Sequence, residues 1–217
     1  MNIHAWPDYL SQLWPGLRTS FLLLVALVAL GTPLSLLLAS TQRSHRKAVR
    51  WTTIGIVEFA RGMPSLVLLY LVYFGLPSFN LTLGAFTAAS VALAINYAGY
   101  TSDAIKSGLD AVPMGQVEAS EALGLSRGVT MRRVILPQAV RIITPPMLSW
   151  IIVYFQTTSI AFAISVPELM SKAYSIASVN FQYLGVFAVA GLLYAVVSIP
   201  GSQLVSALER RQQRGTP

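Results

Sequence analysis

Polar side chains interrupt several stretches of this sequence that are otherwise strongly apolar. They are Glu58, Arg61, Asn96, Gln156, Thr157, Thr158 and Ser159. A polar group in an apolar environment costs free energy unless it meets a partner, so such residues are candidates for contact with a solute. No nucleophile has a base nearby, and neither His4 nor His45 belongs to a metal-ligand spacing. The chemistry predicted is therefore reversible polar binding, with no catalytic residue and no metal site.

Each of these candidates also has a purely structural interpretation. Glu58 and Arg61 are three residues apart and can pair on one helical face, which is the interpretation we favour. Asn96 needs a hydrogen-bond partner in a dry setting. The four consecutive polar residues 156–159 cover all sides of a helical turn, so at least two must face the protein interior or a watery cavity. Helix–helix hydrogen bonding and solute contact both stay open for that run.

Two further charged pairs have helical spacing. Asp103 and Lys106 are three residues apart, and we expect them to pair near a membrane surface. Glu168 and Lys172 are about one helical turn apart in a different polar segment, and we expect them to pair as well.

The composition places the elements that carry these residues in a membrane. Of 217 residues, 54% are hydrophobic and 11% are charged, against about 25% charged in soluble domains. The absence of cysteine excludes disulfides and thiol-ligated metals. The net charge of +7 comes from residues between the apolar stretches, which is typical of a positive-inside membrane protein and not of a nucleic-acid-binding one.

Five stretches reach the length of about 20 apolar residues that a helix needs to cross a bilayer. We predict an all-α polytopic protein with spans at 16–40, 51–76, 83–105, 142–165 and 183–208. Basic residues concentrate in 41–50, in 106–141 and after 208, which puts the N-terminus outside and the C-terminus in the cytoplasm. Residues 1–15 are predicted to lie on the outer membrane surface or to form a disordered tail, and 212–217 to form a cytoplasmic tail.

The predicted cytoplasmic loop 106–141 contains a pattern of its own. Pro113 can begin a short helix and Gly124 can end it, because glycine accepts the left-handed conformation at a helix terminus. Pro137 is expected to break the next segment. The loop is thus predicted to form a short helix, a sharp turn and a second helix that leads into the fourth span. The small residues on the short helix suit docking into a groove on a partner.

These loop residues resemble the cytoplasmic signature of the permeases of ATP-binding cassette (ABC) importers. That signature is Glu-Ala-Ala, three residues, Gly, nine residues, then Ile-x-Leu-Pro. This sequence has Glu118-Ala119-Ser120, then Gly124, then Val134-Ile135-Leu136-Pro137, with Ser120 and Val134 as conservative departures. The resemblance extends from about Gly16 to Arg211 and is closest to the branch that takes up polar amino acids and opines.

The resemblance implies a five-span type I importer permease fold of the MetI-like kind in a bacterial inner membrane. Its implied partners are a second permease, identical or not, two cytoplasmic ATPases that hold ATP and Mg, an external solute-binding protein and the bilayer. This chain has no phosphate-binding loop, so no cofactor is expected on it. The residues that the resemblance assigns to ATPase coupling are Glu118, Ala119, Ser120, Glu121, Ala122, Leu123, Gly124, Leu136 and Pro137.

The resemblance also assigns a central polar site to Asn96 and Gln156, and one departure bears on it. Relatives usually have an acidic residue where this chain has Thr157, and they often have Gln at Leu68 and a Glu–Arg pair at Asp103 and Lys106. Without the acid, a substrate amino group loses its obvious partner. Either the solute is not a plain cationic amino acid, with opine-like or ectoine-like solutes as alternatives, or this chain is the non-binding scaffold half of a heterodimer.

An ion-coupled transporter or channel is the main rival interpretation. Such transporters usually show inverted repeats and broken helices, and the sequence shows no internal repeat.

Overall fold

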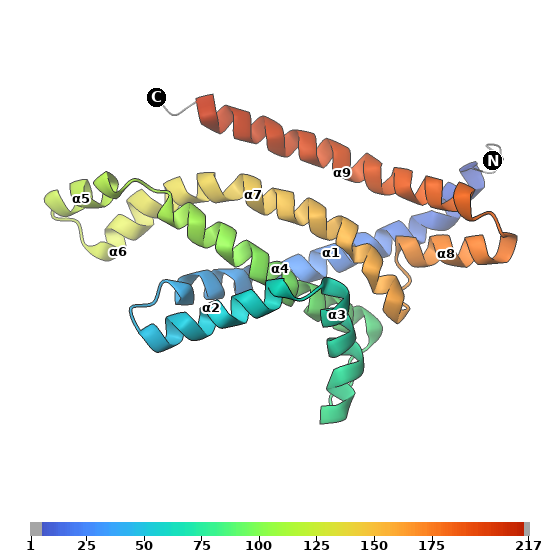
Figure 1. Ribbon diagram of the computed structural model, residues 1–217. Helices are drawn as coiled ribbons and strands as arrows, with labels where there is room; N and C mark the ends of the chain where they lie inside the picture. Colours follow the sequence, from blue (N-terminus) through green and yellow to red (C-terminus); the bar gives the residue numbers. More distant parts are fainter. Residues whose placement is uncertain (1–5, 215–217) are drawn as a thin grey trace.

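The structure is a computed structural model that describes the backbone of residues 6–214 and the side chains to residue 212. The α-helices are α1 (Trp6–Gln42), α2 (Lys47–Gly62), α3 (Ser65–Tyr70), α4 (Ala85–Asp110), α5 (Met114–Ala122), α6 (Arg127–Thr130), α7 (Leu136–Thr157), α8 (Leu169–Asn180) and α9 (Tyr183–Arg214). Short π and 3-10 segments, η2 (Leu71–Gly75), η3 (Leu76–Phe79), η4 (Met131–Ile135) and η5 (Thr158–Ile164), continue α3, α6 and α7. The predicted all-α class is confirmed for these residues (Figure 1).

Helix α4 is the centre of the fold and packs against α1, α2, α3 and α7. Small residues let these helices approach closely, as is usual in membrane bundles. A Cβ on Gly31 of α1 would lie 3.0 Å from the Ala94 carbonyl of α4, and one on Gly108 would lie 2.3 Å from the Ile143 side chain of α7. The main core therefore forms around α4, between α1 and α7.

Three described helical segments are long and apolar enough to cross a membrane, namely 6–42, 127–164 and 183–212. The α2–α3 pair adds a fourth if it counts as one bent span. Helix α4 is not among them, because Asn96, Thr101 and Ser102 lower its apolar character. These three residues are buried in protein, so α4 does not need a lipid-compatible surface at those positions.

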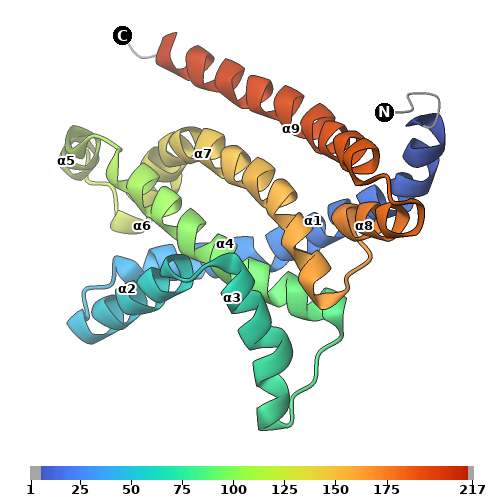
Figure 2. The same ribbon diagram turned by 45° about the vertical axis from the view of Figure 1, so that its right-hand side comes forward.

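The segment 51–76, predicted as the second span, is not one straight helix. Helix α2 ends at Gly62, and the helix from Ser65 to Phe79 leaves it at an angle of 101° (Figure 2). Pro64 has no N–H and disfavours a helical conformation in the residue before it. Met63 accordingly has an extended backbone, with ψ of 135°.

The predicted boundary at residues 15 and 16 does not appear as a break, since α1 runs without interruption from Trp6. Tyr9, Leu13 and Leu17 are buried against residues of α8 and α9. Residues 6–15 thus form packed helix and not a disordered tail, whereas residues 1–5 of the predicted outer segment lie outside the described residues. At the other end, α9 continues to Arg214 into the predicted cytoplasmic tail, and 215–217 lie outside the described residues.

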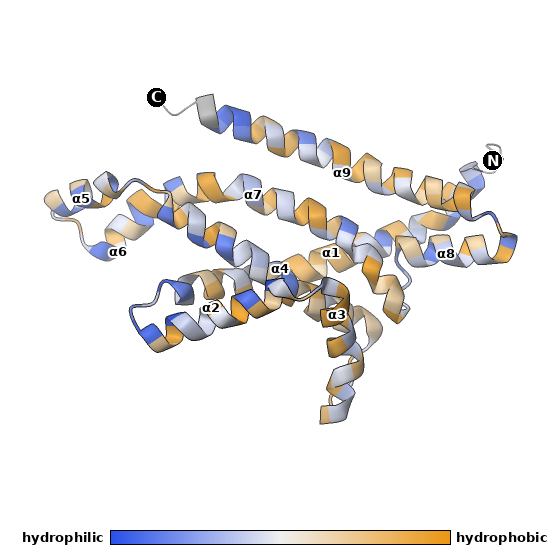
Figure 3. Cartoon of the chain, in the orientation of Figure 1, coloured by the Kyte–Doolittle hydropathy of each residue, from blue (hydrophilic) through white to orange (hydrophobic). Residues whose placement is uncertain are grey.

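Hydrophilic residues lie at both ends of the molecule. Figure 3 shows one group at the left of the view, on the turn between α1 and α2, on α5 and α6 and on the C-terminal part of α9, and another at the right, on and beside α8. The described N-terminal residues and α8 lie at the opposite end (Figure 1). The basic segments 41–50, 106–141 and the end of α9 therefore share one end of the bundle.

Candidate functional site

The short helix α5 has well-defined ends. Pro113 precedes it with an extended backbone (ψ 134°), and Gly124 follows it with φ of +71°. The N–H of Gly124 donates to the Glu121 carbonyl at 2.9 Å, and that of Leu125 donates to the Ser120 carbonyl at 3.0 Å. This pair of bonds is a Schellman motif, which requires a left-handed residue at Gly124. The predicted glycine stop is thus present in the structure.

Nearly all the predicted coupling residues are exposed. Glu118, Ala119, Glu121, Ala122 and Gly124 face solvent, and the Leu123 side chain is 77% exposed. Leu136 and Pro137, at the start of α7, are exposed too. Ser120 is the exception, because it is buried and donates to the Gln116 carbonyl at 2.7 Å. The arrangement presents a small-residue helix with a large exposed apolar side chain at each end, Met114 at its start and Leu123 at its tip.

Pro137 does not break the helix, contrary to our prediction. It lies just after the π turn η4, a local widening of the helix, and the backbone stays helical from α6 through η4 into α7. Gln138 donates from Nε2 to the Val134 carbonyl at 2.9 Å and to Gln116 Oε1 at 3.4 Å. The second of these bonds joins α5 directly to α7, which continues into the apolar part of the bundle.

Asn96 occupies the break between α2 and α3. Its Nδ2 donates to the Ala60 carbonyl at 2.7 Å and to the Met63 carbonyl at 3.4 Å. Its Oδ1 accepts from the Ser65 hydroxyl at 2.8 Å and from the Tyr154 hydroxyl at 2.7 Å. The Ala60 carbonyl needs such a donor because its helical partner would be the N–H that Pro64 lacks. All four hydrogen-bonding positions of the amide are therefore occupied.

Arg61 connects the same break to α4. It pairs with Glu58 at 2.6 Å, as predicted from the spacing, and it also pairs with Asp103 of α4. Its carbonyl accepts from the Tyr100 hydroxyl at 2.9 Å. The structure thus places this charged group between two helices, where it holds the end of α2 against α4.

The predicted Asp103–Lys106 pair does not form. Asp103 faces Arg61 of α2, and Lys106 instead pairs with Asp110 at 3.2 Å. Asp110 also lies 3.5 Å from Arg43 at the end of α1. Both i,i+3 and i,i+4 neighbours share a helix face, so spacing alone did not decide which acid Lys106 would meet.

The polar run 156–159 marks the change from α7 to the 3-10 segment η5. Thr157 donates to the Val153 carbonyl at 2.9 Å, and the buried Thr158 donates to the Phe155 carbonyl at 2.6 Å. Ser159 is half-buried and Gln156 is exposed. Tyr154 reaches Asn96, whereas Gln156, two residues further, lines a gap beside α9. The structure therefore places Asn96 and Gln156 on different sides of α7.

Glu168 is a buried residue whose role sequence reasoning missed. Its carboxylate accepts from the N–H groups of Met170 and Ser171 at 2.8 and 2.7 Å, and from the Tyr194 hydroxyl of α9 at 3.0 Å. It also accepts from Ser20 of α1 at 3.4 Å. An acidic residue just before a helix is a known N-cap signal, so the sequence could have revealed the cap. The predicted Glu168–Lys172 pair does not form.

Burial raises the pKa of Glu168 to about 7, and the hydrogen bonds it accepts only partly offset that effect. Glu168 joins α8 to both α1 and α9, so three elements meet at one carboxyl group.

Comparison with known proteins identifies the family. The model of the family described as binding-protein-dependent transport system inner membrane component matches residues 31–214. The chain belongs to this family of inner membrane transport components. A Bacillus subtilis (strain 168) relative named "Probable amino-acid ABC transporter permease protein YckA" is 33% identical over 211 residues, covering 97% of this chain and 92% of the relative.

Solved structures agree with this membership in fold. A chain from a crystal structure of an amino acid ABC transporter with histidines superposes with a TM-score of 0.91 at 33% identity, covering 97% of this chain and 99% of that one. The MetNI methionine ABC transporter in an inward-facing conformation gives a TM-score of 0.68 at 21% identity, covering 96% and 99%. The MetI-like importer permease fold expected from the resemblance is confirmed.

Proposed function

We propose that this chain is the permease subunit of an ABC importer for amino acids or related small polar solutes. The observation that carries the proposal is α5: an exposed helix, closed by Gly124 in the left-handed conformation and joined to α7 through Gln138. Its residues match the importer signature at the expected spacing. The relative YckA and the solved amino acid transporter, both 33% identical, support the amino-acid class.

The proposed topology has five crossings, by α1, the bent α2–α3 pair, α4, α7 and α9, with the N-terminus outside. The three basic segments at one end of the bundle support this orientation, because Lys and Arg stay on the cytoplasmic side. The proposal keeps the predicted spans at 16–40, 51–76, 83–105, 142–165 and 183–208, and it keeps residues 106–141 as the cytoplasmic coupling loop.

The energy comes from ATP and Mg bound to two ATPase subunits on other chains. Each ATPase binds the Leu123 tip of α5 in a surface groove. When the two ATPases close on ATP, they move α5 together with α6 and α7. A second permease, identical or not, completes the pathway, and the paired subunits alternate between inward and outward openings. An external solute-binding protein delivers the solute at the α8 end.

A second candidate function is the scaffold half of a heterodimer that binds no solute. Two observations favour it: the hydrogen-bonding positions of Asn96 are all occupied, and Thr157 uses its hydroxyl on its own helix. If this subunit does bind solute, the alternative is the uptake of opine-like or ectoine-like solutes, because no acid at position 157 is available to pair with the amino group of a plain cationic amino acid.

Purification from native membranes tests the main proposal. The tagged chain in mild detergent is expected to bring down an ATP-hydrolysing subunit, and Gly124→Trp to reduce ATP-driven uptake by its complexes at least tenfold. Gly128→Trp is the matched control, because Gly128 is also exposed with open space around it but has no left-handed conformation. Absence of ATPase activity from the wild-type preparation, or normal uptake with Gly124→Trp in assembled complexes, contradicts the proposal.

A further inference from the structure

An apolar groove, the α1–α4–α7 groove, lies between the three helices for which we name it. Its volume is about 400 Å³, which falls within the range of about 300–1,000 Å³ that is typical of ligand sites. On α7 its lining runs from Leu136 to Leu148, a distance of about 18 Å at a rise of about 1.5 Å per residue. A bilayer core is about 30 Å thick, so the groove is about as long as the hydrocarbon part of one leaflet.

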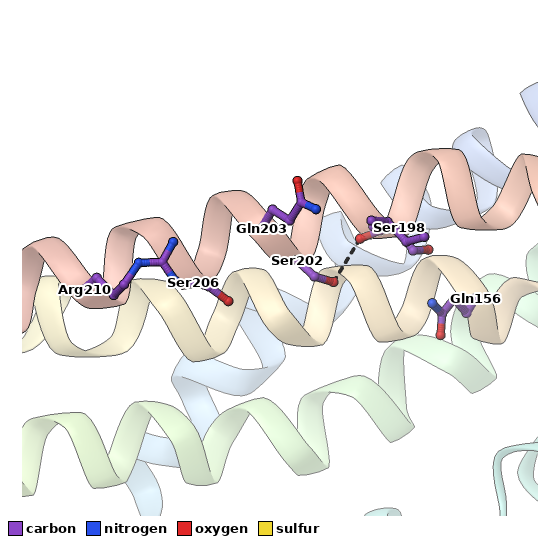
Figure 4. Close-up of a pocket in the computed structure, with 7 residues that line it drawn as sticks. Gln156, Ser198, Ser202, Gln203, Ser206 and Arg210 are labelled. Atoms are coloured by element: carbon purple, nitrogen blue, oxygen red, sulfur yellow. Dashed lines mark hydrogen bonds between the residues drawn. The ribbon is translucent and has the colours of Figure 1, made fainter.

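The lining of this groove offers no free polar group to a ligand. The Ser40 hydroxyl donates to the Leu37 carbonyl at 2.8 Å, and the Thr144 hydroxyl donates within its own helix at 2.6 Å. No amide or charged side chain is among the described residues that line it. The gap beside α9, by contrast, is lined by hydroxyl, amide and guanidinium groups, Gln203 and Arg210 among them (Figure 4). A hydrocarbon chain therefore fits the α1–α4–α7 groove and not the gap beside α9.

One end of the groove lies at the basic end of the molecule. Ser40 is two residues before the end of α1, and Leu136 is the first residue of α7. The exposed Arg132 and Arg133 in η4 precede Leu136 by four and three residues, so they lie about one turn beyond it in the continuous helix. Neither arginine forms an ion pair with an acid among residues 6–212.

The remaining charges at this end add to the positive balance. Arg43, Lys106 and Asp110 lie within three residues of lining positions, and both cations pair with Asp110. Together with Arg132 and Arg133 they make four cations and one carboxylate, a net charge of +3. A hydrocarbon-lined groove with a positively charged end matches the chemistry of a lipid that has an acyl chain and an anionic headgroup.

We propose that the α1–α4–α7 groove binds one acyl chain of an anionic phospholipid of the cytoplasmic leaflet, and that Arg132 and Arg133 hold the phosphate of its headgroup. The site goes beyond the transport function proposed above, and only the choice of leaflet rests on the proposed orientation. Because η4 joins α6 to α7, the bound headgroup stabilises the base of the coupling loop. The competing occupants of the groove are a second permease and an ATPase subunit.

Native mass spectrometry of the complexes purified through the tagged chain tests the site. The complexes are exchanged into mixed micelles that contain equal amounts of phosphatidylglycerol and phosphatidylcholine. We expect the wild type to retain phosphatidylglycerol in preference, and the double variant Arg132→Gln, Arg133→Gln to retain at least threefold less of it. The matched control is Arg46→Gln, Lys47→Gln, because these exposed cations lie at the same basic end but six and seven residues beyond Ser40.

A second pair of variants tests the groove itself. Val140→Trp fills it from a side chain that is 56% exposed, and we expect the same threefold loss of phosphatidylglycerol. Leu37→Trp is its control, because Leu37 is 58% exposed on α1 but is not a lining residue, and it should leave retention unchanged.

Four results would overturn the lipid site. They are no preference for phosphatidylglycerol in the wild type, an equal loss in the Arg46→Gln, Lys47→Gln control, unchanged retention in Val140→Trp, and a loss of the second permease or the ATPase from Val140→Trp complexes that keep their lipid. The last of these shows that a protein covers the groove. None of the four affects the proposed importer function, which depends on whether an ATPase is purified with the wild-type chain.

Discussion

The α5 turn and the α2–α3 break are two sharp changes of direction that the protein stabilises in opposite ways. The α5 turn is exposed, and its bonds join residues three to five apart in sequence, such as Leu125 to Ser120. The break is exposed on one side, at Gly62 and Pro64, and on its inner side its carbonyls accept hydrogen bonds from Asn96 and Tyr100 of α4, which are distant in sequence. An exposed turn can leave its backbone groups to water, whereas groups that face the protein interior must be bonded within the protein.

This difference suits the proposed roles. A surface that docks on another chain benefits from a rigid local shape that needs little support from its own bundle. A break inside the bundle needs its neighbours in place, so it reports on whether α2, α4 and α7 are correctly assembled. Mutations at the two places should therefore separate transport coupling from folding.

The largest effect on stability is expected from Asn96→Leu. It removes the donors to the Ala60 and Met63 carbonyls and the acceptor for Tyr154, and each buried group left unbonded costs about 1–3 kcal/mol. We expect a loss of roughly 4 kcal/mol in unfolding free energy, measured by denaturation in detergent. Ser90→Ala is the control, because Ser90 is buried on the same helix but bonds only its own backbone at Phe86. Equal losses in the two variants would contradict the role of Asn96 at the break.

The buried Glu168 carboxyl, which connects α8 to α1 and α9, should make the stability of the protein depend on pH. The folded pKa of about 7 is above the ordinary 4.5, so the folded protein holds the proton more tightly than the unfolded chain. This contribution is complete below about pH 4.5 and is lost as the pH rises through 7. At about 1.4 kcal/mol per pKa unit the loss is on the order of 3 kcal/mol.

Melting temperatures at pH 5 and pH 8 check that expectation. The difference between them should be smaller in Glu168→Gln than in the wild type, because the amide cannot ionise. Glu118→Gln, at an exposed acid of α5, should leave the difference unchanged. An unchanged pH response in Glu168→Gln would show that this carboxyl does not titrate with folding.

Gly124→Ala at the α5 turn should lower the free energy of unfolding, whereas Gly128→Ala in the nearby α6 should raise it. Gly124 has φ of +71°, where a Cβ costs about 1–2 kcal/mol, whereas Gly128 lies in helical backbone, where alanine gains about 0.5–1 kcal/mol. Amide hydrogen exchange of α5 should rise in the first variant and not in the second. Slower exchange in Gly124→Ala would mean that the left-handed turn is not essential to the helix end.

The smallest effect is expected from Asp103→Asn, which removes one of the two partners of Arg61. The side chains of this pair are about one-third exposed, and partly exposed ion pairs contribute about 0–1 kcal/mol. A double-mutant cycle with Arg61→Gln measures the coupling directly. A coupling energy well above about 1 kcal/mol would show that this pair behaves as a buried interaction and not as a partly exposed ion pair.

The features predicted correctly depend on neighbouring residues, but some local features, such as the N-cap at Glu168 and the Lys106–Asp110 pair, were missed along with those that depend on distant residues. Gly124 and the helix before it follow from local backbone rules, and the Glu58–Arg61 pair follows from helical spacing. Pro64 was a local signal for a break, whereas the size of the angle depends on the hydrogen bonds from Asn96 and Tyr100, which the sequence does not reveal. The apolar character of residues 66–76 favoured one straight span there.

Glu168 shows that the partner of a charged residue is also difficult to predict from spacing alone. Its spacing to Lys172 suggested a surface pair, but its carboxyl is buried between Ser20 and Tyr194, two residues far away in sequence. The coupling loop was therefore predictable almost in full, whereas the polar residues of the bundle could be named but not assigned to partners.

Photo-crosslinking from α5 tests the central claim most directly. In this cysteine-free chain, Leu123→Cys can be labelled with a benzophenone maleimide in native membranes, and its tip is 77% exposed. We predict an adduct with a subunit that carries a phosphate-binding loop, and a change in its yield when ATP is added. Phe181→Cys, 80% exposed at the opposite end of the bundle, should give no such adduct. Failure of Leu123→Cys to crosslink to an ATPase, in membranes where transport is intact, would contradict the claim that α5 is the coupling helix.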